Sequence, residues 1–187
     1  TKSAKLGSLV EKFNLEVLRS GKNWEDRQIT TEDVNRPGLQ LTGFFDYFGE
    51  ERLQVIGLVE TSYLEGLPPE ERLLRFEELL RHDIPALIIS RGLDPYPECM
   101  EMAEKHDRTV LRTRETTSEF MSTLIAYLKW YLSPSITRHG VLVEIYGEGT
   151  LLLGESGIGK SETAIELVDM VEAKAGDLGL NASTRTY

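Results

Sequence analysis

Between residues 53 and 113, hydrophobic and polar positions follow two alternating patterns. Short apolar runs such as "IPALIIS" predict strands, and they occupy residues 53–60, 84–90 and 108–113. Between these runs, the segments "PPEERLLRFEELLRH" (68–82) and "PYPECMEMAEKH" (95–106) carry apolar residues at helical spacing. Strands that alternate with helices are typical of a parallel sheet covered by helices. We therefore predict a small N-terminal α/β domain with a largely parallel sheet.

Signals at the ends of these segments support the helices. The helix at 68–82 has Pro69 in its first turn, acidic residues early, and Arg81 and His82 late, as the helix dipole favours. The segment "TTSEFMSTLIAYLKWYLS" (116–133) predicts a further helix, capped by a Thr or Ser at residues 116 to 118. The sequence "SPS" (133–135) breaks it, so we assign residues 1–132 to the first domain and 133–187 to a second.

The second domain begins with a different pattern. The segment "GVLVEIYGEGTLLLG" (140–154) contains two β runs, and Gly147-Glu148-Gly149 between them predicts a hairpin turn. The second run leads directly into a glycine-rich segment and a helix-like pattern. In most nucleotide-binding proteins with a phosphate loop, the strand before that loop belongs to a parallel sheet and has no hairpin partner just before it. The hairpin predicted here therefore indicates a less common architecture. We expect a P-loop nucleotide-binding domain in which a β-hairpin enters the phosphate loop.

The glycine-rich segment matches the phosphate-loop pattern G-x-x-x-x-G-K-[ST] in full. Its residues are Gly154, Glu155, Ser156, Gly157, Ile158, Gly159, Lys160 and Ser161. Glycines let successive N–H groups point inward at a phosphate, and the start of a helix adds positive potential. Lys160 is then expected to reach the β and γ phosphates of ATP, and the Ser161 hydroxyl to bind Mg²⁺. The alternative is a glycine-rich turn between a strand and a helix with an exposed lysine.

Other titratable residues give weaker signals. His139 stands at the entrance of the hairpin, where a lone histidine more often has a surface or hydrogen-bonding role than a catalytic one. Glu155 and Glu162 are interpreted as solvated carboxylates, because acids beside bound phosphates are repelled. His82 and His106 lie near the ends of predicted helices, where a structural role is sufficient.

Composition bears on the possible binding partners and on the cellular compartment of the protein. The chain of 187 residues has 31 acidic and 21 basic residues and a net charge of −10, which opposes the phosphates of nucleic acid. We expect no nucleic-acid partner. The lone Cys99 cannot form an internal disulfide, and "TKSAKLGSLVEKF" lacks the apolar core of a signal peptide, so we expect a cytoplasmic protein. The longest apolar stretch is interrupted by Lys129 and is too short to span a bilayer, so no membrane partner is expected.

The segment "RHGVLVEIYGEGTLLLGESGIGKSETAIEL" closely resembles the loop region of the bacterial HPr kinase/phosphorylase family. The segments "NRPGLQLTGFFDYFGEERLQVIGLVE", "DIPALIISRGLDP" and "TTSEFMSTLIAYL" resemble the N-terminal domain of that family, and the resemblance runs from about Lys5 to Val168. It implies phosphorylation and phosphorolytic dephosphorylation of a serine in the phosphocarrier protein HPr, which controls carbon metabolism. It also implies ATP or pyrophosphate at residues 154–161, Mg²⁺ at Ser161, catalytic roles for Lys160 and His139, and a homohexamer.

After Val168 the sequence departs from the family. Members continue into a strand that ends in two adjacent aspartates, one of which is the catalytic base, whereas this chain continues "DMVEAKAGDLGLNASTRTY". Its "LGLNAS" resembles the C-terminal helix region of the family, so we expect that a long middle section is missing between the two parts. Asp169 and Asp177 are not expected to replace the base.

Two other functions stay open at this stage. One is a non-catalytic module that senses a nucleotide or phosphate and signals through the α/β domain. The other is a kinase for a small molecule with an appended domain, which the match of the N-terminal segments disfavours.

Overall fold

The computed structural model describes residues 2–134, 139–145, 148–154 and 182–186. The chain divides into two compact units, Thr1–Pro134 and Ser135–Tyr187, and each is described by itself.

The first unit is built on a five-stranded sheet in the order β2-β7-β6-β5-β4. Its strands are β2 (Glu16–Arg19), β4 (Val34–Asn35), β5 (Leu53–Ile56), β6 (Leu87–Ile89) and β7 (Val110–Arg112). Strands β4, β5, β6 and β7 run parallel, and β2 pairs antiparallel with β7. The predicted α/β domain with a largely parallel sheet is therefore confirmed.

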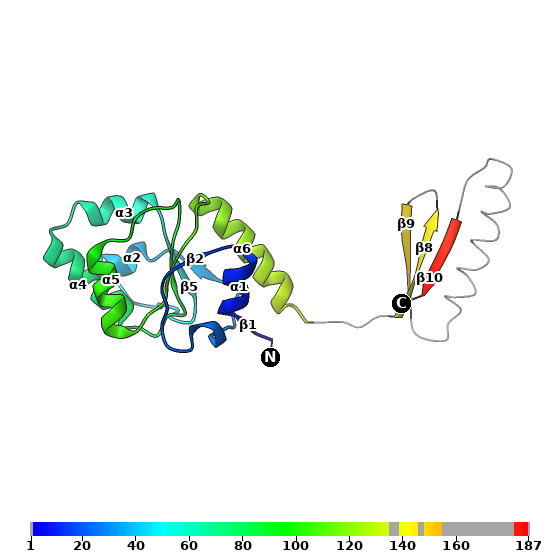
Figure 1. The fold of residues 1–187 in the computed structure, drawn as a ribbon, viewed down its shortest axis with the longest axis horizontal. Coiled ribbons are helices and arrows are strands. Elements are labelled where there is room, and N and C mark those ends of the chain that lie inside the picture. The colour runs from blue at the N-terminus through cyan, green and yellow to red at the C-terminus, as the bar shows by residue number, and fades with distance from the viewer. Residues whose placement is uncertain (1, 135–138, 146–147, 155–181, 187) are drawn as a thin grey trace. The chain divides into compact units, whose positions relative to one another are not determined.

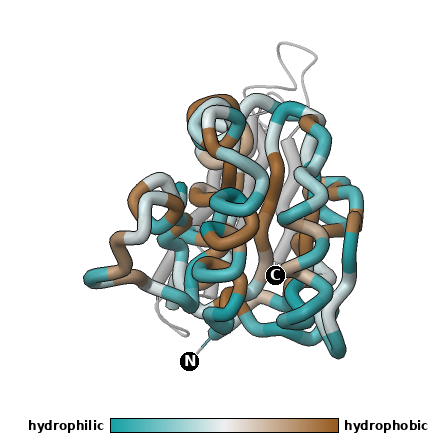
Figure 2. The backbone as a smooth tube through the Cα atoms, turned by 90° about the vertical axis from the view of Figure 1, so that its left-hand side faces the viewer, coloured by the Kyte–Doolittle hydropathy of each residue, from teal (hydrophilic) through white to brown (hydrophobic). Residues whose placement is uncertain are grey.

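Helices cover both faces of this sheet (Figure 1). The helices α2 (Gly38–Leu41), α3 (Leu58–Glu65), α4 (Pro69–Leu80) and α5 (Pro97–His106) lie on one side, and α1 (Leu6–Lys12) and α6 (Thr117–Leu132) lie on the other. Along the helices nearest the viewer in Figure 2, hydrophobic and hydrophilic residues alternate, as expected for helices with one face on a core. The central strands β5 and β6 are buried along their whole length, as strands between two layers of helices must be.

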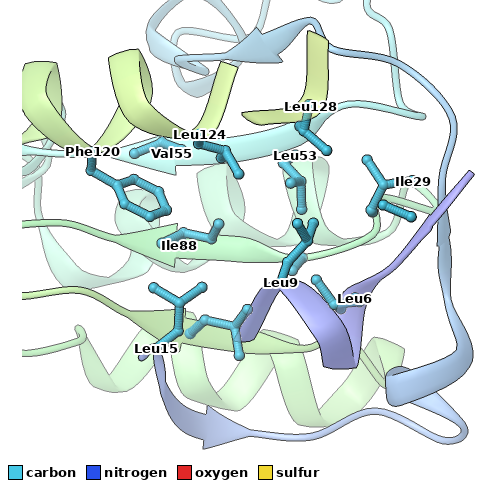
Figure 3. Close-up of a cluster of buried hydrophobic side chains, with 13 residues drawn as sticks. Leu6, Leu9, Leu15, Ile29, Leu53, Val55, Ile88, Phe120, Leu124 and Leu128 are labelled. Atoms are coloured by element: carbon cyan, nitrogen blue, oxygen red, sulfur yellow. The ribbon is translucent and has the colours of Figure 1, made fainter. Parts of the chain in front are cut away.

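Successive side chains of the strands pack alternately into two hydrophobic cores, one on each face of the sheet. Val55 and Ile88 pack with α1 and α6 in the cluster shown in Figure 3, together with Phe120, Leu124 and Leu128 of α6. Their neighbours in sequence, among them Ile56, Leu87 and Ile89, point to the other face and pack with α4 and α5. Side chains alternate between the two faces of a strand, and both faces are buried here. These strands therefore consist of continuous apolar runs in the sequence.

The starts of the predicted helices have the expected signals. Pro69 and Pro97 are the first residues of α4 and α5, where a missing N–H is harmless. Thr116 caps α6, because its Oγ1 accepts a hydrogen bond from the N–H of Glu119 at 3.4 Å. The helices predicted at 68–82, 95–106 and 116–133 are confirmed.

The prediction of one strand at 53–60 is wrong in its second half. The strand β5 ends at Ile56, and Leu58 begins α3. Glu60 reaches back to the start of this helix, where its Oε2 accepts a hydrogen bond from the N–H of Gly57 at 3.1 Å. The glycine followed three residues later by a glutamate is the signal of a helix start inside the apolar run.

The first 50 residues add short elements that periodicity does not identify. Strands β1 (Ala4–Lys5) and β3 (Gln28–Ile29) form a two-stranded antiparallel sheet, and η1 (Trp24–Asp26) is one turn of 3₁₀ helix. Elements of two to four residues are too short to show a hydrophobic period.

In the second unit, three strands form an antiparallel sheet in the order β10-β8-β9. They are β8 (His139–Ile145), β9 (Glu148–Gly154) and β10 (Ala182–Thr186). The predicted hairpin is confirmed, but its turn is displaced. Ile145 pairs with Glu148, so Glu148 and Gly149 belong to β9 and the connection is residues 146–147. The regular pairing of β8 with β9 therefore includes a glycine that the pattern alone assigns to the turn.

Two residues of the segment "LGLNAS", Ala182 and Ser183, are among the described residues. Both lie in β10, where they pair with Ile145 and Glu144 of β8. Residues 178–181 of the same segment, and the phosphate loop after Gly154, lie outside the described residues. Within the described ranges, no helix is long and apolar enough to cross a membrane.

Candidate functional site

The hairpin of the second unit places two of the predicted site residues opposite each other. Strand β9 ends at Gly154, the first glycine of the phosphate-loop pattern, and Gly154 is the register partner of His139 at the start of β8. The pairing continues without a shift from this point to Ile145 and Glu148. The backbone of His139 is therefore fixed beside the point where the chain enters the loop.

The other predicted site residues lie outside the described residues. These are Glu155, Ser156, Gly157, Ile158, Gly159, Lys160 and Ser161, together with Glu162, Asp169 and Asp177. Of the side chain of His139 nothing further follows from the backbone register. In the described part of the chain, no group of three or more His, Cys, Asp and Glu side chains is arranged to hold a metal ion.

In the first unit, polar side chains gather where the parallel strands end. Ser90 follows β6 and is buried, and its Oγ donates a hydrogen bond to the carbonyl of Ile56 at 3.1 Å. The Oγ of Ser90 also lies 2.5 Å from Oγ1 of Thr117, which is buried in the first turn of α6. A Cβ atom on Gly57 would overlap Oγ1 of Thr117 and lie 3.0 Å from Oγ of Ser90. Only glycine fits here, and the hydroxyls are used in packing α6 against the sheet.

An ion pair between a partly exposed arginine and a buried carboxylate holds α3 at the same edge. The guanidinium of Arg36, which follows β4, donates two hydrogen bonds of 2.7 Å to the carboxylate of Glu60, whose side chain is 3% exposed. Burial raises the pKa of Glu60, but hydrogen bonds from Arg36 and from the N–H groups of Glu60 and Gly57 outweigh it, so the pKa is lowered. Arg36 and Glu60 belong to different elements, so no local spacing in the sequence predicts this pair.

The two histidines of the first unit make structural contacts. The ring of His82 is stacked on Phe45 with centroids 4.7 Å apart, and its Nδ1 lies 2.8 Å from the carbonyl of Glu78. His106 at the end of α5 lies 2.6 Å from Glu77 of α4, between Nε2 and Oε2. The hydrogen bond from His106 lowers the pKa of Glu77, against a smaller effect of burial. These contacts join helices and loops.

Two hollows open on the first unit. One, of about 330 Å³, lies where β6 and β7 begin, and its charged residues include Arg27, Asp83, Asp107 and Arg108. Asp83 pairs with both Arg27 and Arg108, at 2.7 and 3.4 Å, so these charges satisfy one another. The other hollow, of about 480 Å³, is lined by Thr61, Ser62, Glu65, Leu93, Asp94 and Tyr96. Its Tyr96 hydroxyl donates to Glu65 at 2.7 Å and is held by packing of the ring against Arg72.

Comparison with protein families assigns both parts of the chain. Residues 5–128 match the family described as HPr Serine kinase N terminus, and residues 130–174 match the HPr Serine kinase C-terminal domain.

Individual relatives agree with this match. A protein named HPr kinase/phosphorylase from Caldicellulosiruptor bescii is 47% identical over 163 residues, which cover 87% of this chain and 52% of the relative. Proteins of the same name are 50% identical over 161 residues in Thermoanaerobacter sp. (86% of this chain, 52% of the relative) and 47% identical over 168 residues in Listeria monocytogenes (90% and 54%). The chain thus spans about half the length of the curated relatives it matches.

Among solved structures, the CBS and DRTGG domains of the regulatory region of Clostridium perfringens pyrophosphatase give a TM-score of 0.47 at 18% identity, over 70% of this chain and 51% of that one. A likeness of this degree carries no functional argument. The family model of the N-terminal domain alone matches more than half of the chain, the second model matches the residues that follow, and the chain belongs to the HPr serine kinase family.

Proposed function

We propose that this chain is part of an enzyme that phosphorylates a serine of the phosphocarrier protein HPr and removes the phosphate by phosphorolysis. The observation that carries the proposal is the complete phosphate-loop pattern that starts at the end of β9, in a chain that belongs to the HPr serine kinase family. ATP or pyrophosphate serves as the donor.

The loop residues have distinct proposed roles. The N–H groups of residues 154–161 bind the phosphates, and the ammonium of Lys160 neutralises charge on the β and γ phosphates. The hydroxyl of Ser161 is a suitable ligand for Mg²⁺, which prefers oxygen ligands and is usually shared with substrate phosphates. The strand ending at Gly154 fits this arrangement, because a phosphate loop begins where a strand ends. When bound, Mg²⁺ neutralises negative charge on the phosphates.

His139 is proposed to act on the transferring phosphoryl group or its acceptor. Its register position opposite Gly154 supports this role, because it keeps the residue at the mouth of the loop instead of within the cradle of N–H groups. In the proposed forward reaction, the serine oxygen of HPr attacks the γ phosphorus of ATP, a base takes the serine proton, and ADP leaves. In reverse, inorganic phosphate attacks phosphoserine, and pyrophosphate and serine are formed. The role of base is assigned to no residue of this sequence, which has no Asp-Asp pair after Ser161.

The test uses the complete gene product with purified HPr. We expect phosphate from ATP on a serine of HPr, and its removal by added inorganic phosphate. Lys160→Ala removes a charge-assisted contact worth about 1.5 to 3 kcal/mol, so both directions should slow by roughly ten- to 150-fold. Lys129→Ala, an exposed lysine of α6, is the matched control and should keep full activity.

His139→Ala separates the histidine from the lysine. We expect nearly unchanged nucleotide affinity and lower turnover, because the hairpin entrance lies outside the phosphate cradle. Full turnover of this variant would leave His139 with a structural role only.

The alternative function is a nucleotide-sensing module without catalysis. The match of both parts of the chain to the HPr serine kinase families does not favour it. Binding of ATP by the complete gene product without transfer to HPr would establish this alternative, and transfer to a small molecule with HPr unchanged would indicate a different kinase.

Assembly and location are further parts of the proposal. By family membership we propose a homohexamer in the cytoplasm, without a nucleic-acid or membrane partner. Light scattering on the complete gene product should give six times the subunit mass.

A further inference from the structure

Arginines follow three of the four parallel strands of the first unit almost immediately. Arg36 comes directly after β4, Arg91 two residues after β6, and Arg114 two residues after β7. The carboxyl ends of parallel strands share one edge of the sheet, and open α/β sheets bind their ligands at that edge. Arg36 is neutralised by Glu60, whereas Arg91 and Arg114 are exposed and stand on neighbouring strands.

Unlike most arginines of residues 2–134, these two lack a carboxylate partner. Within residues 2–134, the ion-paired arginines are Arg19, Arg27, Arg36, Arg52, Arg72, Arg75, Arg108 and Arg112. In the same range, ion pairs are lacking at Arg81, Arg91 and Arg114. The chain carries ten more acidic than basic residues, so partners are abundant elsewhere. That two unpaired arginines stand next to each other is therefore unusual for this molecule.

The backbone fixes the two arginines on loops that are joined to each other. The N–H of Arg91 donates to the carbonyl of Glu115, and the N–H of Gly92 donates to the carbonyl of Thr113, both at 2.8 Å. Arg114 lies between these two acceptors, and its Cγ is 3.9 Å from the place of a Cβ on Gly92. The two cationic residues are thus held close together.

The loop of Arg91 is also in an uncommon conformation. Arg91 and Gly92 both have left-handed backbone angles, with φ of 60° and 62°. Such a conformation is uncommon for a residue with a side chain, and here the hydrogen bonds to the neighbouring loop hold it in place. Two adjacent cations repel each other, and a bound anion with two negative charges relieves that repulsion. The positive end of the α6 dipole, which begins just after Thr116, adds to the attraction.

We propose that Arg91 and Arg114 form a binding site for a phosphate group at the carboxyl edge of the first unit. The ligand is inorganic phosphate or the phosphate of a small organic ester. Guanidinium groups bind such groups through paired N–H donors. This site is separate in sequence from the proposed phosphate loop and is independent of the catalytic proposal. The exposed carboxylate of Glu115 on the same loop opposes the anion and limits its affinity.

The test is a titration of the full chain, labelled with ¹⁵N, followed by NMR at constant ionic strength. The chain carries Lys160→Ala, so that binding at the phosphate loop does not mask the second site. Inorganic phosphate and glycerol 3-phosphate are titrated separately to identify which source of the phosphate group binds. We expect saturable shifts of the Gly92 and Glu115 amides with at least one of the two.

Three single variants with the same change in charge decide the assignment. Arg91→Gln and Arg114→Gln should each weaken binding by roughly tenfold or more, because each removes a charge-assisted contact. Arg81→Gln, at the end of α4, removes the third unpaired arginine and should change the affinity by less than twofold. Circular dichroism confirms that each variant is folded. The proposal is wrong if neither ligand shifts these amides, or if Arg81→Gln weakens binding as much as the other two.

Discussion

The two units of the chain differ in how many residues determine their main property. In the first, apolar side chains from strands and helices form two clusters, one on each face of a five-stranded sheet, and most arginines are neutralised by nearby carboxylates. In the second, the described strands form an antiparallel sheet whose strand β9 leads into a phosphate-loop pattern. Many distributed residues specify the first unit, whereas the chemistry that we propose for the second depends on a few residues in one segment. Substitutions should therefore have different effects in the two units.

The largest expected effect on stability is at Gly57. Gly57→Ala places a Cβ against Thr117 and Ser90, where no space is available, so α3 and α6 must move apart. We expect a loss of about 3 kcal/mol in the free energy of unfolding, the upper range for overpacking. Urea unfolding followed by tryptophan fluorescence measures it, because both tryptophans, Trp24 and Trp130, belong to the first unit.

Gly38→Ala is the matched control. A Cβ at this first position of α2 meets nothing within 4 Å, so the unfolding free energy should change by less than about 1 kcal/mol. Equal losses for the two variants would show that the packing at Gly57 is not as described.

The next effect concerns Cys99, the single cysteine of the chain. Its side chain is fully buried in α5, and burial raises the pKa of its thiol to about 12. At pH 8, a thiol reagent should label the folded chain at least roughly a hundredfold more slowly than the chain unfolded in urea. Labelling of native chain at the unfolded rate would contradict the closed core of the first unit.

A smaller loss is expected at the ion pair of Arg36 with Glu60. Arg36→Gln leaves the carboxylate of Glu60 buried without its cation, which should destabilise the first unit by about 2 kcal/mol. Lys5→Gln interrupts the exposed pair with Asp26, whose side chains are 59% and 76% exposed, and should cost less than about 0.5 kcal/mol. If both variants lose a similar unfolding free energy in urea, burial of the Glu60 carboxylate does not make its ion pair more important than the exposed one.

The smallest expected effect is the dependence of this ion pair on pH. The pKa of Glu60 is lower in the folded chain than its ordinary value of 4.5, so its contribution is complete above that pH and is lost as the pH falls through the folded value. The wild-type chain should therefore lose its advantage over Arg36→Gln as the pH falls below about 4.5. A constant difference in unfolding free energy between pH 7 and pH 3 would contradict this role of Glu60.

The sequence predicted those parts of the molecule that repeat a pattern over several residues. The helices α4, α5 and α6 and the strands β6 and β7 follow from periodicity and end signals, because each buries a regular set of side chains. The start of α3 was missed, since "LVE" continues the apolar run of β5 and only Glu60, through its bond to Gly57, marks the change. The short strands before residue 50 depend on pairing with distant segments, which periodicity does not encode.

The candidate site is a prediction of a different kind. The phosphate-loop pattern is a local signal, and the hairpin register that sets His139 opposite Gly154 follows from two adjacent strands. The pairing of Arg36 with Glu60 and the proximity of Arg91 and Arg114 arise only when separate strands of the parallel sheet come together. No spacing in the sequence predicts either one.

The most direct test of the central claim compares nucleotide binding with the stability of the first unit in the same proteins. Mg-ATP is titrated calorimetrically into the full chain and into Lys160→Ala, and tryptophan fluorescence follows urea unfolding of both. The account predicts that Lys160→Ala binds Mg-ATP at least roughly tenfold more weakly and keeps the unfolding midpoint of the first unit. Equal affinity of the two proteins for Mg-ATP would contradict the assignment of the nucleotide site to residues 154–161.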